Sequence, residues 1–67
     1  MYQFYVTYID RDGRTKTYYS AHWSIRYHAE DGISSYVRGL EERGRTVIDW
    51  GVAAGCRVAP STVIVNS

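Results

Sequence analysis

The N-terminal part of the chain shows the alternation of side chains that is typical of β-strands. Nearly every residue of Tyr2–Asp10 favours a strand, and the residues fall into two alternating rows. Asp12 and Gly13 follow, a dipeptide that tolerates the positive φ angles of a two-residue hairpin turn. A second alternating stretch runs over Thr15–Arg26. The pattern predicts a hairpin of two antiparallel strands.

A two-residue turn determines which side chains of the two strands share a face of the sheet. It places Val6 opposite Tyr19 and Phe4 opposite Ala21, so that the apolar rows of both strands lie on one face. This is the expected core face. The other face is expected to be uncovered and to combine aromatic with basic side chains, namely those of Tyr5, Thr7, Ile9, Lys16, Tyr18, Ser20, His22 and Arg26.

The hydrophobic period changes to that of a helix over Ala29–Arg43. Glu30 and Asp31 suit the positive N-terminal end of the helix dipole, and Gly44 stands where a left-handed C-cap is needed. The sequence therefore predicts one amphipathic helix. Its apolar stripe is formed by Ala29, Ile33, Tyr36, Val37 and Leu40.

Two further strands are expected after the helix. Arg45–Val52 alternates again, and Thr62–Val65 is a short β-branched run that Pro60 limits upstream. A single sheet face and a single helix stripe must bury each other. The predicted fold is therefore α+β, in the order β-β-α-β-β, with an antiparallel sheet and one helix packed on one face.

Length and composition further restrict the number of domains and the cellular compartment that the sequence permits. At 67 residues it is long enough for one core, so residues 1–67 are expected to form a single domain. Cys56 is the only cysteine, which leaves no internal disulfide and suits a reducing compartment. No apolar run reaches the roughly 20 residues of a membrane span. A soluble, cytoplasmic protein is expected, and the formal net charge of +1 selects no class of partner.

Residues that could carry out chemistry are few and form no known catalytic motif. Cys56 follows Gly55 without any nucleophile signature and is interpreted as a small, partly buried apolar residue. His22, His28 and Cys56 could together supply three metal ligands, but their spacing fits no helix pair, and the predicted strand places His22 on the open face. We therefore expect no catalytic residue, no metal and no cofactor, and predict that the protein is not an enzyme.

The aromatic content is the strongest functional signal in the sequence. Seven tyrosines, two tryptophans and one phenylalanine are more rings than one helix-on-sheet core of this size can bury. Tyr5 and Tyr18 are expected to stay exposed on the open sheet face, beside Lys16, His22 and Arg26. Tyrosine and arginine are enriched in protein interfaces, so these residues form a predicted binding surface for a protein partner. The alternative is that the tyrosines only stabilise cross-strand pairs.

Small residues on the helix give a second candidate surface. Gly32 and Gly39 each cost a helix interior up to about 1 kcal/mol relative to alanine, and with Ser35 they form a strip where another backbone could approach closely. Such a strip either receives a partner or passes over the protein's own strands.

Single-stranded RNA or DNA is the second class of partner that the sequence permits. Bases would stack on Tyr5 and Tyr18, while Arg14, Lys16 and Arg26 would meet phosphates. The near-neutral net charge argues against this alternative.

The outline of the chain resembles the small inhibitors that bacteriophages encode, anti-CRISPR proteins among them. The shared features are a very short chain, a tyrosine-rich hairpin over Tyr2–Tyr27, one helix and trailing strands. The resemblance implies an inhibitor in the host cytoplasm that blocks a functional surface of a larger host complex. The segment Tyr27–Ile33 after the hairpin also resembles HicB-type antitoxin domains. An antitoxin or a structural homodimerisation module is therefore a further alternative, and the protein is expected to be a monomer or a homodimer.

Overall fold

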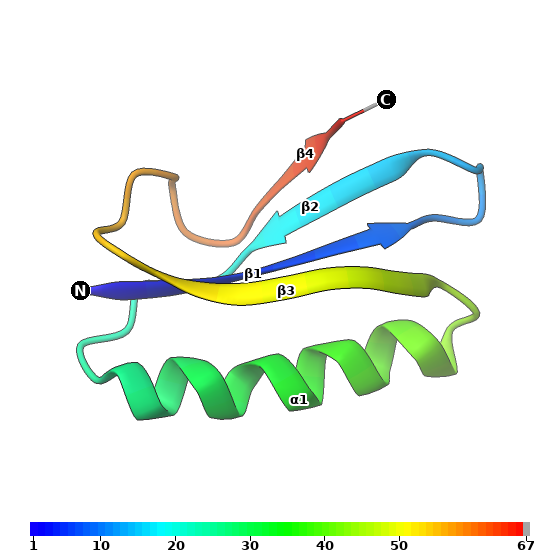
Figure 1. Cartoon of the computed structure of the whole chain (residues 1–67). Helices are drawn as coiled ribbons and strands as arrows, with labels where there is room; N and C mark the ends of the chain where they lie inside the picture. The colour runs from blue at the N-terminus through cyan, green and yellow to red at the C-terminus, as the bar shows by residue number, and fades with distance from the viewer. Residues whose placement is uncertain (67) are drawn as a thin grey trace.

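One antiparallel sheet and one helix make up the fold of the computed structural model, which describes residues 1–66 (Figure 1). The elements follow in the order β1 (Tyr2–Ile9), β2 (Thr15–Tyr19), α1 (Arg26–Glu42), β3 (Thr46–Ala54) and β4 (Thr62–Val65). In the sheet the order is β3-β1-β2-β4, and each neighbouring pair is antiparallel. The predicted α+β class and the β-β-α-β-β order are confirmed.

The hairpin between β1 and β2 closes with a three-residue loop. The Asp10 amide donates to the Arg14 carbonyl at 2.9 Å, and the Gly13 amide donates to the Asp10 carbonyl at 2.9 Å. Arg11, Asp12 and Gly13 therefore form the loop, with Gly13 at φ 80° in the left-handed region that glycine adopts without strain. The predicted two-residue turn is wrong, because Gly13 is the third loop residue and not the second residue of a two-residue turn.

The extra loop residue shifts the pairing of the hairpin by one position. Val6 lies opposite Tyr18, and Tyr5 lies opposite Tyr19. A shift of one residue turns every side chain of a strand to the other face. Tyr18 therefore lies on the helix side of the sheet, and Tyr19 takes the place on the open face that was predicted for Tyr18. The predicted pairing of Val6 with Tyr19 is wrong.

The second strand is also shorter than its alternating pattern predicts. β2 ends at Tyr19, and Ser20 interrupts the ladder because its Oγ accepts a hydrogen bond from the Phe4 amide at 2.9 Å. Only an isolated bridge between Tyr2 and Trp23 continues the pairing. The predicted strand Thr15–Arg26 is therefore wrong beyond Tyr19.

The helix begins three residues before the predicted start. α1 opens at Arg26 and its first turn contains no acidic residue, so Glu30 and Asp31 lie too far into the helix for the predicted interaction with its N-terminal dipole. The predicted C-terminus is confirmed. Gly44 has φ 81°, and the amides of the two residues that follow Arg43 donate to the carbonyls of Glu41 and Leu40 at 3.0 Å each.

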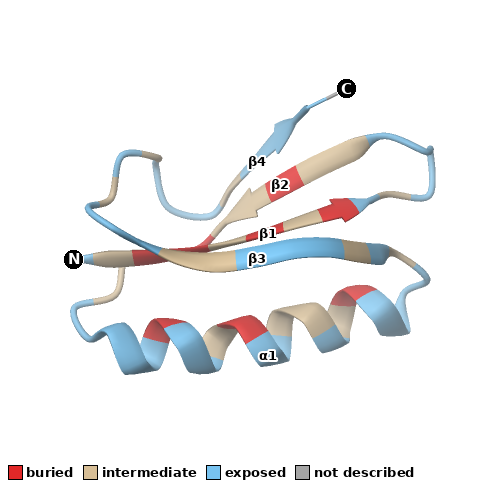
Figure 2. Ribbon diagram, in the orientation of Figure 1, coloured by how far each residue is buried: buried red, intermediate tan, exposed pale blue. Residues whose placement is uncertain are grey.

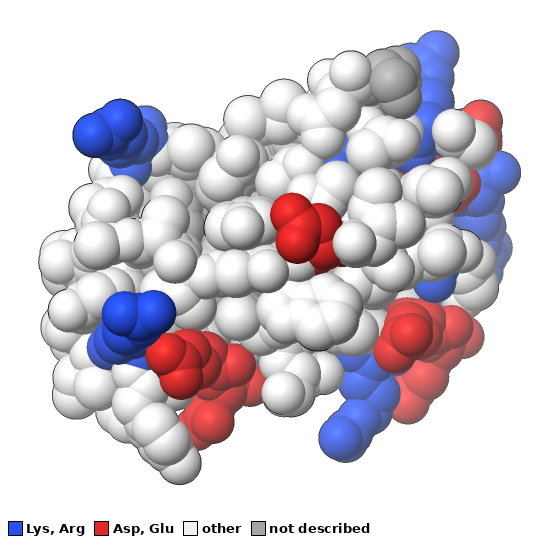
Figure 3. Space-filling model, in the orientation of Figure 1, with Lys and Arg blue, Asp and Glu red and all other residues white. Residues whose placement is uncertain are grey.

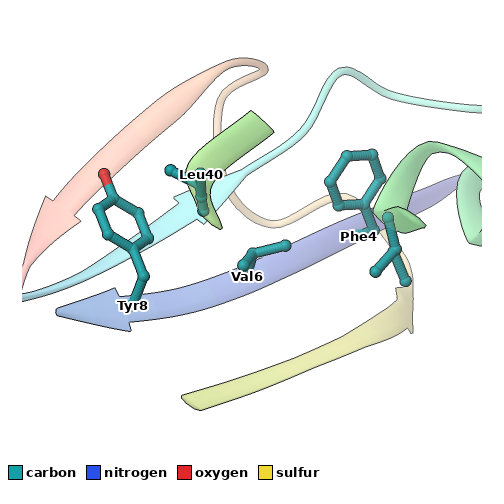
Figure 4. Packing of buried hydrophobic residues seen from close by; sticks show 5 residues of the cluster. Phe4, Val6, Tyr8 and Leu40 are labelled. Carbon is teal, nitrogen blue, oxygen red and sulfur yellow. The ribbon is translucent and has the colours of Figure 1, made fainter. Parts of the chain in front are cut away.

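The core lies between β1 and α1. Phe4, Val6 and Tyr8 point from β1 to the same side and pack with Ile33 and Leu40 of the helix (Figure 4). Buried residues accordingly gather on β1 and on the side of α1 that faces it (Figure 2). Burial of each such side chain stabilises the fold by about 1.5–3 kcal/mol.

The last two strands form the two edges of the sheet. β3 begins one residue after the start of the predicted strand Arg45–Val52 and ends two residues beyond it, at Ala54. β4 has the predicted bounds. β3 contains a bulge, because Asp49 pairs with Thr7 whereas Val47 pairs with Tyr8. The helix lies across β1 and β3, so β2 and β4 extend beyond it (Figure 1).

Candidate protein-binding surfaces

The open face of the sheet, which points away from α1, is less aromatic and less basic than predicted. Tyr5 and Tyr19 lie side by side on it, with ring centroids 6.4 Å apart. Beside them the hydroxyls of Thr7 and Thr17 form a hydrogen bond of 2.9 Å, and the Asn66 amide donates to Thr17 at 2.7 Å. Within residues 1–66, the strands bring no lysine or arginine to this face.

Charged side chains gather elsewhere on the molecule. Figure 3 shows them around the β1–β2 hairpin and along the helix, while the surface over the middle of the sheet is mostly uncharged. Asp49 is the one charged residue of β3. The predicted open face that combines aromatic with basic side chains is therefore wrong.

Lys16 belongs to an ion cluster on the helix side of the sheet. It lies opposite Tyr8, and its Nζ is 2.6 Å from Asp10 Oδ2, while Arg45 Nε is 2.8 Å from Asp10 Oδ1. The hydrogen bond from Lys16, the Arg11 amide and the nearby Arg45 charge lower the pKa of Asp10 to about 2. The ammonium group of Lys16 is thus held by a carboxylate, and its predicted place on the open face is wrong.

Arg26 also lies away from the open face. It is the first residue of α1, and its Nε is 3.1 Å from Glu30 Oε1 on the exposed side of the helix. His22 lies in the connection after β2, where its Nε2 is 2.9 Å from the Val58 carbonyl oxygen, the same oxygen that accepts a hydrogen bond from Gln3. Of the five residues predicted to form one surface, Lys16, Tyr18 and Arg26 lie elsewhere, and Tyr5 keeps its predicted place. Their role in binding stays a prediction.

The loop between β3 and β4 closes one end of the open face. Gln3 Nε2 donates to the carbonyls of Ser20 at 2.8 Å and Val58 at 3.0 Å, which ties the loop to β1 and β2. A pocket of about 360 Å³ remains beside it, lined by Gln3, Tyr19, Ala53, Ala54, Gly55, Arg57 and Val58. Three of its lining side chains carry polar groups, those of Gln3, Tyr19 and Arg57, and the Gln3 amide is already bonded to the two carbonyls.

The helix side of β2 and β4 forms a second surface, which we call the shelf. Tyr18 stacks on Tyr36 of α1 with ring centroids 4.0 Å apart and an angle of 7° between the planes. Val63 pairs with Tyr18, and Val65 lies two residues further along β4 on the same face. Both valines are about half exposed, at 49% and 51%. Tyr18, Tyr36, Val63 and Val65 therefore form an apolar surface beside the helix.

The two glycines of the predicted helix strip have different surroundings. A Cβ on Gly32 would lie 2.7 Å from Phe4 Cε2, so Gly32 is required by the protein's own core. A Cβ on Gly39 would meet no atom within 4 Å. Gly39 follows Tyr36 by one turn and Ser35 is exposed, so both lie on the flank of α1 next to the shelf. The strip thus combines one structural glycine with one that the fold does not explain.

β3 is the longer of the two edge strands. The Gly55 amide donates to the Met1 carbonyl at 2.9 Å, which sets the alternation along the β1–β3 ladder. Asp49 and Gly51 bond to β1, so the amides and carbonyls of Trp50 and Val52 point outward. The Trp50 side chain is 55% exposed.

Side chains that could bind a metal are dispersed over the part of the chain that the structure describes. Within residues 1–66, no three side chains of histidine, cysteine, aspartate or glutamate come close enough to hold a metal ion. Cys56 is a free, half-buried thiol. None of the helices described is long and apolar enough to cross a membrane.

Comparisons with known proteins give no match to any family, curated protein or solved structure. The candidate surfaces therefore rest on the geometry of this chain alone.

Sequence reasoning missed the residues that form the floor of the shelf. Val63 and Val65 were assigned only to a short strand, and Tyr18 was placed on the wrong face. The order Asp10-Arg11-Asp12-Gly13-Arg14 does contain the signal for a three-residue loop, because a type I turn is commonly followed by a left-handed glycine. That reading would have placed Tyr18 on the core side.

Proposed function

We propose that the protein works by binding another protein, and that the shelf receives a helix of this partner. The observation that carries the proposal is the half-covered sheet. α1 lies over β1 and β3, so within the described chain no element covers Val63 and Val65. Contiguous exposed apolar side chains on a small protein favour an interaction site.

The dimensions of the sheet favour a helix as the group that binds there. Neighbouring strands are about 4.8 Å apart, so a helix centred over β2 and β4 would lie about 10 Å from α1. Packed helices are typically separated by about 8–10 Å. Gly39 and Ser35 line the flank of α1 that such a helix would meet, and small side chains permit close contact there. The helix propensity lost at Gly39 then has a physical reason.

The resemblance to small phage proteins implies that the protein is an inhibitor. It would bind a larger complex and block a functional surface of that complex. A rigid domain with one apolar surface is suited to that role, and no cofactor is required. The nucleic-acid alternative is less favoured, because Tyr5 and Tyr18 lie on opposite faces and Lys16 is paired with Asp10.

The test begins with capture of the partner from a bacterial lysate and its identification by mass spectrometry. Affinities are then measured with the purified partner. Gly39→Leu and Val63→Lys should each weaken binding at least tenfold, because one fills the flank of the shelf and the other places a charge on its floor. Glu41→Ala, on the exposed side of α1, is the matched control. Wild-type affinity of both folded shelf variants would disprove the proposal, as would partner binding that disappears after nuclease treatment.

A further inference from the structure

We infer that β3 is a self-association edge, where two copies of the chain pair antiparallel about a two-fold axis with Trp50 of one copy opposite Trp50 of the other. This pairing joins the two sheets into one. It involves the edge opposite to β4 and therefore does not depend on the proposed function of the shelf.

The edge of β3 has the features of a strand that accepts another strand. It is nine residues long and contains no proline or lysine, and its bulge lies at Ile48, so the ladder is regular from Asp49 to Ala54. The outward amides and carbonyls of Trp50 and Val52 have no partner strand within the described chain. β4, at the other edge, is only four residues long. β3 is therefore the edge that can form the longer ladder.

A two-fold axis allows only a few registers. Side chains opposite each other must share a face. One residue must therefore lie directly opposite its own copy, with the axis midway between the two. An axis at Asp49 would place two carboxylates directly opposite each other, which is destabilising. An axis at Trp50 places Asp49 opposite Gly51 of the second copy, within the part of β3 that is free of the bulge. This register pairs the one acidic residue of the strand with a residue that has no side chain.

The Trp50 register also supplies a hydrogen-bond donor for Asp49. The Tyr5 ring lies across Gly51, with its hydroxyl 2.7 Å from the point that a Cβ on Gly51 would occupy. Asp49 of the second copy would lie about 5 Å from that point, within reach of the hydroxyl. Neither the Tyr5 hydroxyl nor the Asp49 carboxylate has a hydrogen-bond partner within residues 1–66. The two-fold axis would form this bond twice.

In the dimer the Trp50 side chain becomes less exposed on the helix side of the sheet. Its side chain is 55% exposed in the single chain and would meet the same ring of the second copy across the ladder. The pairing thus covers the largest exposed apolar side chain of β3.

Sedimentation at micromolar concentration tests the association. The wild-type protein should have the mass of a dimer, and Trp50→Lys should be a monomer with an unchanged circular dichroism spectrum. Val63→Lys, the same change on the other edge strand, should remain a dimer. A wild-type monomer at every concentration would overturn the inference, and so would a dimer that persists in the Trp50→Lys protein.

Cysteine cross-linking tests the register in a Cys56→Ser background. Residues in a hydrogen-bonded antiparallel pair have Cα atoms about 5.5 Å apart, which is within the range of a disulfide. Trp50→Cys should therefore cross-link to itself. Val52→Cys should not, because it lies two positions from the axis on each copy. Self-linkage of Val52→Cys would contradict the proposed register.

Dimer dissociation constants test the bond between Tyr5 and Asp49. Tyr5→Phe and Asp49→Ala should each weaken the dimer roughly a hundredfold, about tenfold for each of the two symmetry-related bonds. The double variant should be no weaker than either single variant, because both changes remove the same bonds. Additive effects would show that the two residues do not contact each other in the dimer.

Discussion

Tyr18 of β2 stacks on Tyr36 of α1, with ring centroids 4.0 Å apart and nearly parallel planes. This contact joins the second strand to the helix even though α1 lies over β1 and β3. It exists only because the hairpin loop has three residues, which turns Tyr18 toward the helix. The same contact makes Tyr18 both a core residue and the inner edge of the shelf.

The position of Tyr18 predicts different costs for two neighbouring tyrosines. Tyr18→Ala should lower the free energy of unfolding by about 2 kcal/mol, because the variant loses the stack on Tyr36 and the contact with Phe4. Tyr19→Ala should cost less, about 1 kcal/mol, since Tyr19 lies on the open face beside Tyr5. Urea denaturation of both variants measures the difference, and equal costs would contradict the observed register.

Substitution of the two helix glycines should change stability in opposite directions. Gly39→Ala should raise the free energy of unfolding by up to about 1 kcal/mol, because alanine favours a helix and its Cβ meets no atom within 4 Å. Gly32→Ala should lower it, because the new Cβ would collide with the Phe4 ring. Thermal unfolding of the pair is the measurement. If both variants became more stable, the close contact between Gly32 and Phe4 would be refuted.

Tyr36 should make the protein less stable at high pH. Burial raises the pKa of Tyr36 from 10.0 to about 12, with smaller contributions from Tyr8 and Tyr18. The unfolded chain therefore loses this proton at lower pH than the folded chain does. Its contribution to stability is complete below pH 10 and is lost as the pH rises toward 12. Denaturation of the wild type and Tyr36→Phe across this range isolates the effect from the other tyrosines. A constant difference between the two proteins would contradict the prediction.

Asp10 should make the free energy of unfolding decrease at acidic pH. Its pKa is lowered from 3.8 to about 2 by Lys16, the Arg11 amide and Arg45, so the unfolded chain takes up this proton first. The stabilisation is present above pH 3.8 and is lost as the pH falls toward 2. Asp10→Asn should therefore be less stable at neutral pH and should lose less stability in acid. Asp31→Asn, on the exposed side of α1, is the control. The prediction fails if both variants follow the wild-type acid profile.

Several elements could be predicted from the sequence because local chemistry decides them. The apolar period marks the helix, and Gly44 ends it, since a left-handed C-cap needs a residue without a Cβ. Thr62–Val65 is bounded by Pro60 and by the end of its β-branched run. The start of the helix was less clear, because Ile25 at its N-cap provides no side-chain hydrogen bond.

The candidate site was harder to predict because it depends on one residue of register. Asp12-Gly13 fits both a two-residue and a three-residue loop, and the two loops place Tyr18 on opposite faces. The position of α1 across the sheet is likewise set by the packing of its Leu40 in one cluster with Phe4 of β1, which no local pattern records. The shelf follows from both features together.

A one-residue deletion in β2 provides a direct test of this explanation. Deletion of Thr15 keeps the three-residue loop between Asp10 and Arg14 and shifts the rest of β2 by one position, which would place Val6 opposite Tyr19. Tyr18 would then turn away from Tyr36, and the core would have to repack around the other row of β2. The deletion should therefore unfold the domain or lower its stability by several kcal/mol, well beyond the typical change of about 1 kcal/mol for a single mutation. Insertion of one glycine after Gly13 is the matched control, because a longer loop can keep the native register at a small entropic cost. Chemical denaturation compares the two. Wild-type stability of the deletion variant, with Tyr19 replacing Tyr18 against the helix, would show that the sequence tolerates either register and that the pairing of the hairpin does not decide the fold.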